Sequence, residues 1–210
     1  MDLDESRTRL LTHLRWEISD SSVVDAIARV PREAFVPEEM VNAAYDDRPL
    51  DIGYGQTISQ PYIVALMVEA LQLSGDEKVL EVGTGSGYAA AVLSHLAAKV
   101  VTVEIVPELE ETARSALSRL GYSNVEVHRA GDSLGWLPEA PYDAILVSAG
   151  APSIPPILLG QLKWGGRVVI PLGSRLQQNL SRVTRTADGT HVENLGACYF
   201  VPLIGADAWQ

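Results

Sequence analysis

The sequence predicts an α/β fold with a mostly parallel seven-stranded sheet, helices on both faces, antiparallel C-terminal strands and an N-terminal helical cap. Between residues 78 and 162, short runs rich in β-branched residues alternate with helical stretches, which is typical of parallel strands joined by right-handed crossovers. After Gly165-Gly166 the helical pattern stops, and three further strand-like runs are separated by hairpin signals such as Asp188-Gly189. The sheet is therefore expected to end in antiparallel strands.

The N-terminal part of the chain carries helical patterns on either side of one irregular segment. Between residues 4 and 36, apolar residues recur at helical spacing and predict two short amphipathic helices, with Ser19-Asp20-Ser21 supplying cap oxygens between them. Residues 45–60 show neither a helical nor a strand period, so we expect a long, ordered loop. A helix from Gln60 to Leu73 follows, with Pro61 in its first turn.

The alternation of strand-like and helical runs predicts the remaining elements. The predicted strands span residues 78–82, 100–104, 125–128, 144–148, 167–172, 176–186 and 191–201, and the predicted helices span residues 87–98, 107–120 and 153–162. The second of these helices has the clearest boundaries, because Pro107 opens it and Gly121 ends it.

Length and charge limit the class of protein. With 210 residues, 47% of them hydrophobic and 20% charged, the chain is expected to be globular and too short for two large domains. Sixteen Lys and Arg residues against 27 Asp and Glu residues give a formal charge of −11. Because such a field repels phosphate groups and anionic lipids, we expect neither a nucleic-acid nor a membrane partner.

Two further features bear on the compartment. The only cysteine, Cys198, excludes an internal disulfide framework and a cysteine-based zinc site. The first ten residues, MDLDESRTRL, are acidic where a secretory signal would be basic. We therefore expect a cytoplasmic protein.

A glycine-rich loop, Glu81-Val82-Gly83-Thr84-Gly85-Ser86-Gly87, joins a predicted buried strand to a helix. Its glycines allow a ligand to approach the backbone, although a tight turn without a ligand is an alternative. A dinucleotide fingerprint requires glycine where Tyr88 stands, which disfavours NAD. Glu104 ends the next strand, where a carboxylate can accept hydrogen bonds from both hydroxyls of a ribose. The pattern favours a nucleoside without a pyrophosphate.

Together with Gly131-Asp132 after the third strand, these motifs resemble the class I S-adenosylmethionine-dependent methyltransferases. The resemblance implies a Rossmann-like body that binds S-adenosylmethionine and releases S-adenosylhomocysteine. For Asp132, the alternative is a turn residue that caps a loop. The cofactor-binding residues that the resemblance implies are Glu81, Gly83, Thr84, Gly85, Ser86, Gly87, Glu104, Ile105 and Asp132.

The irregular segment carries a second resemblance. Asp47-Arg48-Pro49-Leu50 and Gly53-Tyr54-Gly55-Gln56-Thr57-Ile58-Ser59-Gln60-Pro61 resemble the signature of the protein-L-isoaspartate (D-aspartate) O-methyltransferases. The likeness extends over nearly the whole chain, through the segments 30–37, 142–145 and 200–203. Two positions depart from the family pattern, Ser133 where a second glycine is common and Gly150 where alanine is more usual.

This second resemblance implies an enzyme that methylates the free α-carboxylate of L-isoaspartyl residues in damaged proteins and so starts their repair through a succinimide. Whether D-aspartyl residues are also accepted is left open. Ser59 is the catalytic residue that it implies, with a helix N-cap as the alternative role. The implied substrate-binding residues are Thr57, Ile58, Gln60, Val201, Pro202 and Leu203.

The same resemblance implies a single methyltransferase domain over residues 1–210, with a helical cap and active-site loop over 1–60 and a Rossmann-like body over 61–210. We expect a monomer that uses no metal. A carboxylate acceptor is already ionised at neutral pH, so no general base is needed. We accordingly assign no catalytic role to the four histidines, which are His13, His95, His128 and His191.

Four other functions can be compared with the sequence. Another carboxyl methyltransferase would transfer the methyl group without preferring isoaspartyl peptides. An NAD-dependent oxidoreductase is opposed by Tyr88, and a Ser-His-Asp hydrolase is opposed by Thr84, which stands where a nucleophile elbow around Ser86 needs glycine. A binding module without activity would have no reason to combine Glu81, Glu104 and the Ser59 segment.

Overall fold

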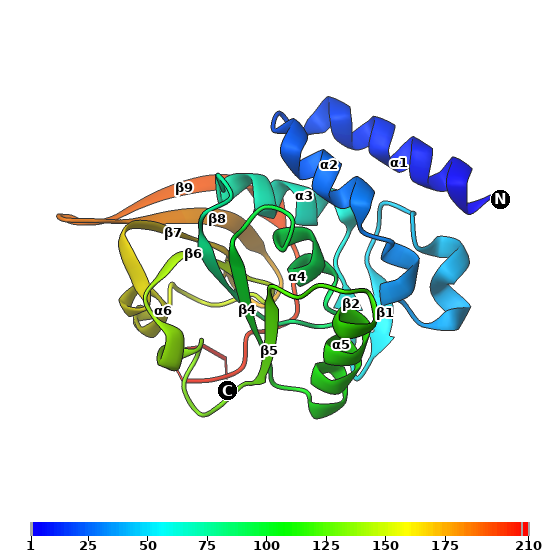
Figure 1. Ribbon diagram of the computed structural model, residues 1–210. Coiled ribbons are helices and arrows are strands. Elements are labelled where there is room, and N and C mark those ends of the chain that lie inside the picture. Colours follow the sequence, from blue (N-terminus) through cyan, green and yellow to red (C-terminus); the bar gives the residue numbers. More distant parts are fainter. Residues whose placement is uncertain (1, 207, 210) are drawn as a thin grey trace.

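Seven strands form the central sheet of the computed structural model, which describes residues 2–206 and 208–209 (Figure 1). In spatial order they are β5 (Val125–Arg129), β4 (Lys99–Glu104), β3 (Lys78–Val82), β6 (Tyr142–Val147), β7 (Leu162–Gly173), β8 (Gln178–Thr186) and β9 (Gly189–Cys198). The first five are parallel, and β8 and β9 are antiparallel to their neighbours. The predicted fold class is confirmed.

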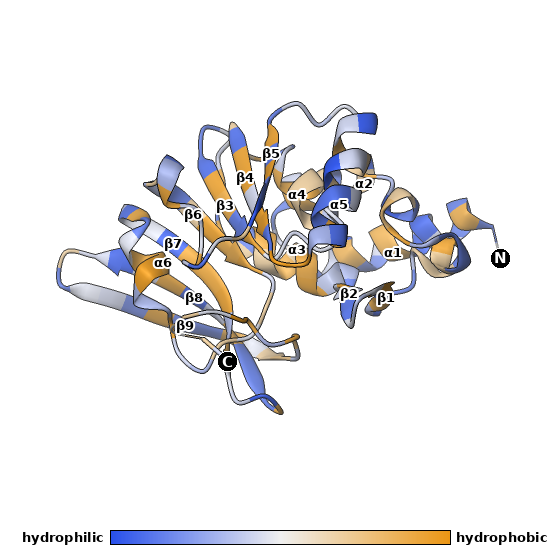
Figure 2. Ribbon diagram, turned by 90° about the horizontal axis from the view of Figure 1, so that it is seen from below, coloured by the Kyte–Doolittle hydropathy of each residue, from blue (hydrophilic) through white to orange (hydrophobic). Residues whose placement is uncertain are grey.

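Helices cover both faces of this sheet, as predicted. Residues that alternate along a strand point to opposite faces, so Val79 joins one hydrophobic cluster and Leu80 joins another. The first cluster is covered by α3 (Pro61–Ala70), α4 (Tyr88–Leu93) and α5 (Pro107–Arg119), and the second by α6 (Pro156–Gly160) beside η3 (Leu137–Glu139). Figure 2 shows the hydrophobic residues that run along the central strands.

The N-terminal cap consists of α1 (Leu3–Glu17), α2 (Ser21–Arg29) and two short 3₁₀ helices, η1 (Arg32–Phe35) and η2 (Glu38–Ala43). Asp20 caps α2 by accepting a 2.9 Å hydrogen bond from the backbone N–H of Ser22, as the sequence predicts. Glu69 of α3 accepts hydrogen bonds from the N–H groups of Ser19 and Asp20 at 2.7 and 2.8 Å. The body therefore holds the turn between the two cap helices.

The segment 45–60 differs from the prediction of an irregular loop. It contains an antiparallel hairpin of β1 (Leu50–Gly53) and β2 (Gln56–Ile58), which turns through Tyr54 at φ 57°. Strands of three and four residues are too short to show a period of two, which explains why the sequence did not reveal them. The hairpin brings Ser59 directly after β2.

Several predicted boundaries are also wrong. The helix expected over 153–162 spans only five residues, because Pro152, Pro155 and Pro156 prevent an earlier start. The helix expected over 87–98 ends at Leu93, and the last strand ends at Cys198. Gly165-Gly166 lies inside β7, where the pairing with β6 shifts register. None of these differences moves an element out of its layer.

The order of the strands fixes where a ligand is expected. The chain runs outward from β3 through β4 to β5, and then returns to the other side of β3 with β6. Ligands of open parallel sheets bind beyond the carboxyl ends of the strands at such a switch point. Among the described residues, no helix has both the length and the apolar character that crossing a bilayer requires.

Candidate functional site

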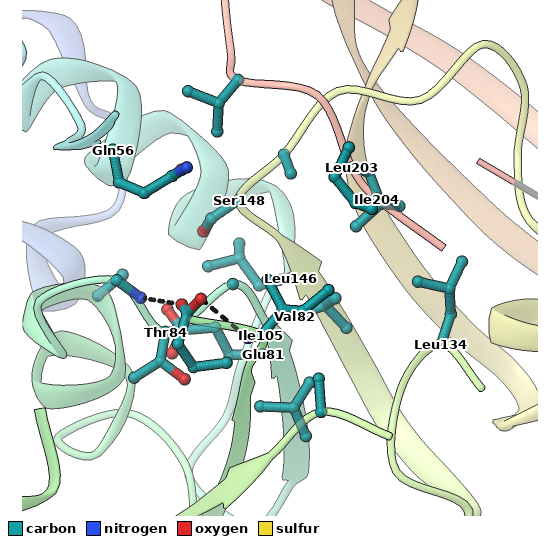
Figure 3. Close-up of a pocket in the computed structure, with 18 of the residues that line it drawn as sticks. Gln56, Glu81, Val82, Thr84, Ile105, Leu134, Leu146, Ser148, Leu203 and Ile204 are labelled. Carbon is teal, nitrogen blue, oxygen red and sulfur yellow. Dashed lines mark hydrogen bonds between the residues drawn. The ribbon is translucent and has the colours of Figure 1, made fainter. Parts of the chain in front are cut away.

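A cavity of about 330 Å³ lies at the carboxyl ends of β3, β4 and β6. Its wall comprises residues 56–59, 81–86, 103–105, 130–135 and 201–205, with Val64, Met67, Tyr88, Ala89, Leu146, Ser148 and Ala149. In Figure 3, Glu81 and Thr84 lie on one side of this space, and Gln56, Leu203 and Ile204 lie on the other. We call residues 81–86, 103–105 and 130–135 the cofactor half of the wall, and residues 56–59 and 201–205 the acceptor half.

Glu81 on β3 is fully buried at the base of the cofactor half. Its Oε2 accepts a 2.6 Å hydrogen bond from the hydroxyl of Thr102, whose oxygen also lies 2.6 Å from that of Thr84. Its Oε1 has no hydrogen-bond partner among the described residues. Burial raises the pKa of this carboxyl to about 8, and the charge of Glu104 adds to the shift. A buried oxygen without a donor suits a ligand that brings a positively charged N–H group.

Glu104 ends β4 and ties the glycine-rich loop to the sheet. Its Oε2 accepts a 2.7 Å hydrogen bond from the N–H of Gly85, and its Oε1 accepts 2.9 Å hydrogen bonds from the N–H groups of Ile105 and Val106. The carboxylate is nearly buried, yet it lines the cavity and retains capacity to accept further hydrogen bonds. Next to it, the side chain of Ile105 is 52% exposed and offers an apolar surface.

The other predicted cofactor residues divide into two groups. Gly83, Thr84, Gly85, Ser86 and Asp132 all lie on the cavity wall, and Asp132 is exposed there. Gly87 lies off the wall, where it is the N-cap residue of α4 at φ 90°. A Cβ atom at this position would lie 3.2 Å from the side chain of Leu117 on α5. This third glycine of the loop therefore serves the close packing of two helices.

Ser59 lies on the acceptor half, directly after β2. Its hydroxyl makes no hydrogen bond within the part of the chain that the structure describes, and its carbonyl accepts one from Arg32. The alternative role as a helix cap is wrong, because Gln60 occupies the N-cap of α3. The N–H of Tyr62 is satisfied instead by Asp47 Oδ1 at 2.9 Å. The hydroxyl of Ser59 is therefore available to a ligand.

The predicted substrate residues are mostly brought together. Thr57 and Ile58 lie on the wall beside Ser59, and Val201, Pro202 and Leu203 lie on it from the C-terminal segment. Gln60 does not lie on the wall, and its amide donates a 2.9 Å hydrogen bond to Asp47 Oδ2. Ser59 and Val201, which are 142 positions apart in the sequence, thus belong to one surface.

A buried glutamine holds the C-terminal segment in place. Gln178 donates a 3.1 Å hydrogen bond to the carbonyl of Phe200 and accepts a 2.9 Å one from its N–H. Gly150 pairs with the same segment through Val201 and Leu203, both at 2.8 Å. A Cβ atom on Gly150 would lie 2.5 Å from the Gln178 amide. The departure from the family pattern at Gly150 thus makes room for this glutamine.

Sequence reasoning missed several residues of the site. Gln56, Ser148 and Ile204 lie on the wall. Ser148 follows β6 at the carboxyl edge of the sheet, and that position was a usable signal. No local pattern marked Gln178 or Arg32, because each acts through residues that are far away in the sequence.

The four histidines lie elsewhere. None of them lines the cavity wall among the described residues. His128 lies on β5 near Glu126 and Glu139, with ligand atoms that all fall within 4.8 Å of one another. Lys99 contacts both carboxylates of this group, at 2.9 and 2.6 Å. This cluster is separate from the cavity.

The sequence profile of the protein-L-isoaspartate (D-aspartate) O-methyltransferase family matches residues 5–208. A protein-L-isoaspartate O-methyltransferase of Geobacter metallireducens is 49% identical over the whole chain and 98% of its own length. One of Rhodopseudomonas palustris is 54% identical over 91% of this chain and 79% of its own.

Two solved structures extend the similarity. One protein-L-isoaspartate O-methyltransferase superposes with a TM-score of 0.86 at 30% identity, over 96% of this chain and 67% of its own. A second, described as a putative enzyme of this kind from Plasmodium falciparum in complex with S-adenosyl-L-homocysteine, has a TM-score of 0.77 at 25% identity, over 92% and 95% of the two chains.

Proposed function

Because this chain belongs to the protein-L-isoaspartate (D-aspartate) O-methyltransferase family, we propose how its own residues divide the work of methyl transfer. It is an S-adenosylmethionine-dependent enzyme that methylates isoaspartyl residues and thereby begins their repair. One observation carries the assignment of roles. A single cavity is lined both by the glycine-rich loop and by Ser59.

The cofactor half fits S-adenosylmethionine. Glu81 Oε1 would hold the ammonium group, since it is buried on the cavity wall without a donor. Glu104 would accept hydrogen bonds from the ribose, and the exposed side chain of Ile105 would contact the adenine, with Asp132 beside it. When bound, the cofactor supplies an electrophilic methyl group on a positively charged sulfur.

The acceptor is the α-carboxylate of an isoaspartyl residue. Carboxyl groups of this kind have a reference pKa of about 3.9, so the oxygen is already a nucleophile at neutral pH. The carboxylate oxygen forms a bond to the methyl carbon while the carbon–sulfur electron pair stays with sulfur, which leaves a methyl ester and a thioether. No proton moves in this step, which agrees with a wall that contains no histidine among the described residues.

Ser59 would orient the carboxylate. The reaction consumes two opposite charges, so strong ionic contacts would stabilise the reactants more than the transition state. Alignment of oxygen, carbon and sulfur is therefore the main contribution that the protein can make. The Ser59 hydroxyl has no hydrogen bond within the described chain and can donate one to the carboxylate.

Discrimination against normal aspartate would come from the acceptor half. An isoaspartyl residue places its free carboxylate one methylene nearer to its backbone than an aspartyl side chain does. Ile58 on one side and Val201–Leu203 on the other would grip the peptide backbone around Ser59. The ester then closes to a succinimide without help and reopens partly as normal aspartate.

We further propose that residues 1–210 form one domain, because one hydrophobic cluster contains Leu14 and Ile27 of the cap together with Tyr88 and Leu117 of the body. Action as a monomer, without a metal ion or a nucleic-acid partner, and location in the cytoplasm stay predictions from the sequence.

The test is the transfer of labelled methyl from S-adenosylmethionine to two synthetic peptides that differ only in an isoaspartyl or aspartyl residue at one position. We expect labelling of the isoaspartyl peptide with little labelling of the other. Equal labelling of both would indicate a carboxyl methyltransferase of another specificity. Labelling of neither, with the cofactor still bound in calorimetry, would contradict the proposed acceptor.

A further inference from the structure

Arg32 is a fully buried cation behind the acceptor half. It begins η1, and an arginine side chain stays protonated in proteins. Burial lowers the pKa of its guanidinium, and the neighbouring Tyr88, Asp47 and Tyr45 oppose that shift only in part. Burying a charge is costly unless its contacts compensate, so those contacts indicate what the residue does.

The guanidinium joins two distant stretches of backbone. Its Nε donates a 2.8 Å hydrogen bond to the carbonyl of Ala44, at the end of η2, and its Nη2 donates one of the same length to the carbonyl of Ser59. Its third nitrogen, Nη1, is buried without a partner among the described residues. Two of its three nitrogens are thus used to fix backbone oxygens.

The same guanidinium lies over the ring of Tyr88, with its central carbon 4.7 Å from the ring centroid. Phe35 packs edge-on against this ring at 5.9 Å. Tyr88 begins α4 directly after the glycine-rich loop, and it lines the cavity as Ser59 does. Arg32 therefore contacts one residue of the acceptor half and one residue at the start of the helix that follows the cofactor loop.

We propose that Arg32 is a positioning residue, which aligns Ser59 with the cofactor loop because its guanidinium binds the Ser59 carbonyl and lies over the Tyr88 ring. The proposal rests on the proposed function, in which Ser59 orients the acceptor. A misplacement of about 1 Å can lower the rate of an aligned reaction roughly 100-fold. A loss of this clamp is therefore expected to affect turnover far more than cofactor binding.

The test compares Arg32→Met and Arg32→Lys with Arg7→Met as a matched control. Arg7 also lies in the cap, donates a hydrogen bond to a backbone carbonyl, that of Ala28, and lies 6.0 Å over an aromatic ring, that of Tyr45. Neither Ala28 nor Tyr45 is part of the cavity wall. The control thus removes the same kind of contact from residues that do not line the cavity.

We expect Arg32→Met to lower kcat about 10- to 100-fold at saturating cofactor while the cofactor Kd changes less than about threefold. Arg32→Lys keeps the positive charge and one donor nitrogen, so it should recover part of kcat. Arg7→Met should lower the melting temperature yet leave kcat within about threefold. If Arg32→Met does not fold, the Arg32→Lys variant alone tests the proposal. We then expect a folded protein with a reduced kcat.

Backbone hydrogen exchange supplies a readout that does not depend on activity. In the Arg32 variants, amides of residues 56–60 should exchange faster, whereas those of residues 81–86 should not. This result would support the clamp even if the wild-type enzyme proved to use another acceptor. The proposal is overturned if the Arg32 variants lose no more kcat than Arg7→Met, or if exchange rises equally in both segments.

Discussion

The two halves of the cavity wall are stabilised in different ways. In the cofactor half, Glu81 and Glu104 stand at the ends of adjacent parallel strands. Glu81 accepts a hydrogen bond from Thr102 on the neighbouring strand, and Glu104 accepts one from Gly85 in the loop that follows the strand of Glu81. The sheet itself therefore builds this half.

In the acceptor half, neither residues 56–59 nor residues 201–205 belong to the main sheet. Their positions depend on Arg32, Asp47 and Gln178, each of which contacts one of these segments or the residues beside it from a distance in the sequence. Substitutions in the two halves should therefore have different effects. Those in the cofactor half should change the cofactor Kd, and those in the acceptor half should change kcat or KM for the peptide.

The largest effect is expected in the cofactor half. Glu104→Gln should weaken binding of S-adenosylhomocysteine about 100-fold or more, because each hydrogen bond to a charged group contributes roughly 1.5–3 kcal/mol and two ribose hydroxyls are involved. Calorimetric titration measures the Kd. Glu108→Gln, an exposed change at the start of α5, is the control. Binding within threefold of the wild type would remove Glu104 from the cofactor site.

A smaller effect, on kcat/KM and not on cofactor affinity, is expected at Ser59. Loss of one hydrogen bond to a carboxylate, worth roughly 1.5–3 kcal/mol, should lower kcat/KM for an isoaspartyl peptide about 10- to 100-fold in Ser59→Ala. The cofactor Kd should not change. Ser115→Ala on the exposed face of α5 should leave both quantities unaltered. Wild-type kcat/KM in Ser59→Ala would exclude the serine from the mechanism.

The cofactor half should also respond to pH through Glu81. In the protein without ligand the pKa of this carboxyl is raised to about 8 by burial, so it is mostly protonated at pH 6 and pH 7. Binding of an ammonium group requires the ionised form, and a proton must leave. Affinity should therefore rise about tenfold from pH 6 to pH 7, where the ligand's own amine stays charged.

Glu81→Gln supplies the control for this pH dependence. Its cofactor affinity should be weaker and nearly the same at both pH values, because the amide does not titrate. If the cofactor affinity of Glu81→Gln still rose from pH 6 to pH 7, the group that loses the proton on binding would be one other than Glu81.

The smallest effect concerns the C-terminal segment. Gly150→Ala would place a methyl group against the Gln178 amide and displace the residues that it holds, so the KM for the peptide should rise about fivefold, as expected for overpacking that costs roughly 1 kcal/mol. The cofactor Kd should stay constant. Gly160→Ala, where a Cβ meets nothing within 4 Å, is the matched control. An unchanged KM would show that Gln178 does not shape the acceptor half.

The same contrast explains what the sequence could predict. The strand at 78–82 was predicted with its observed bounds because Val79, Leu80 and Val82 form a short apolar stretch that ends at a glycine-rich turn. Glu104 was found because it ends the strand after the glycine-rich loop, at the edge of the sheet where ligands bind, and Glu81 was implied by the resemblance of that loop. In both cases a local pattern determines a three-dimensional position.

The acceptor half could be predicted only by resemblance. The hairpin of β1 and β2 is too short to show a period, and Gln60 is drawn away from the wall by Asp47. The buried contacts of Arg32 with Ser59 bridge 27 positions and leave no trace in the spacing of nearby residues. Such tertiary contacts become visible only when the chain is folded.

The most direct test of this account is a crystal structure of the enzyme with S-adenosylhomocysteine and an isoaspartyl peptide. We predict the ribose hydroxyls on Glu104, the ammonium group beside Glu81 Oε1, and the peptide α-carboxylate within hydrogen-bond distance of the Ser59 hydroxyl. A peptide carboxylate bound away from Ser59, or a cofactor whose ribose does not contact Glu104, would contradict the division of the cavity into two halves.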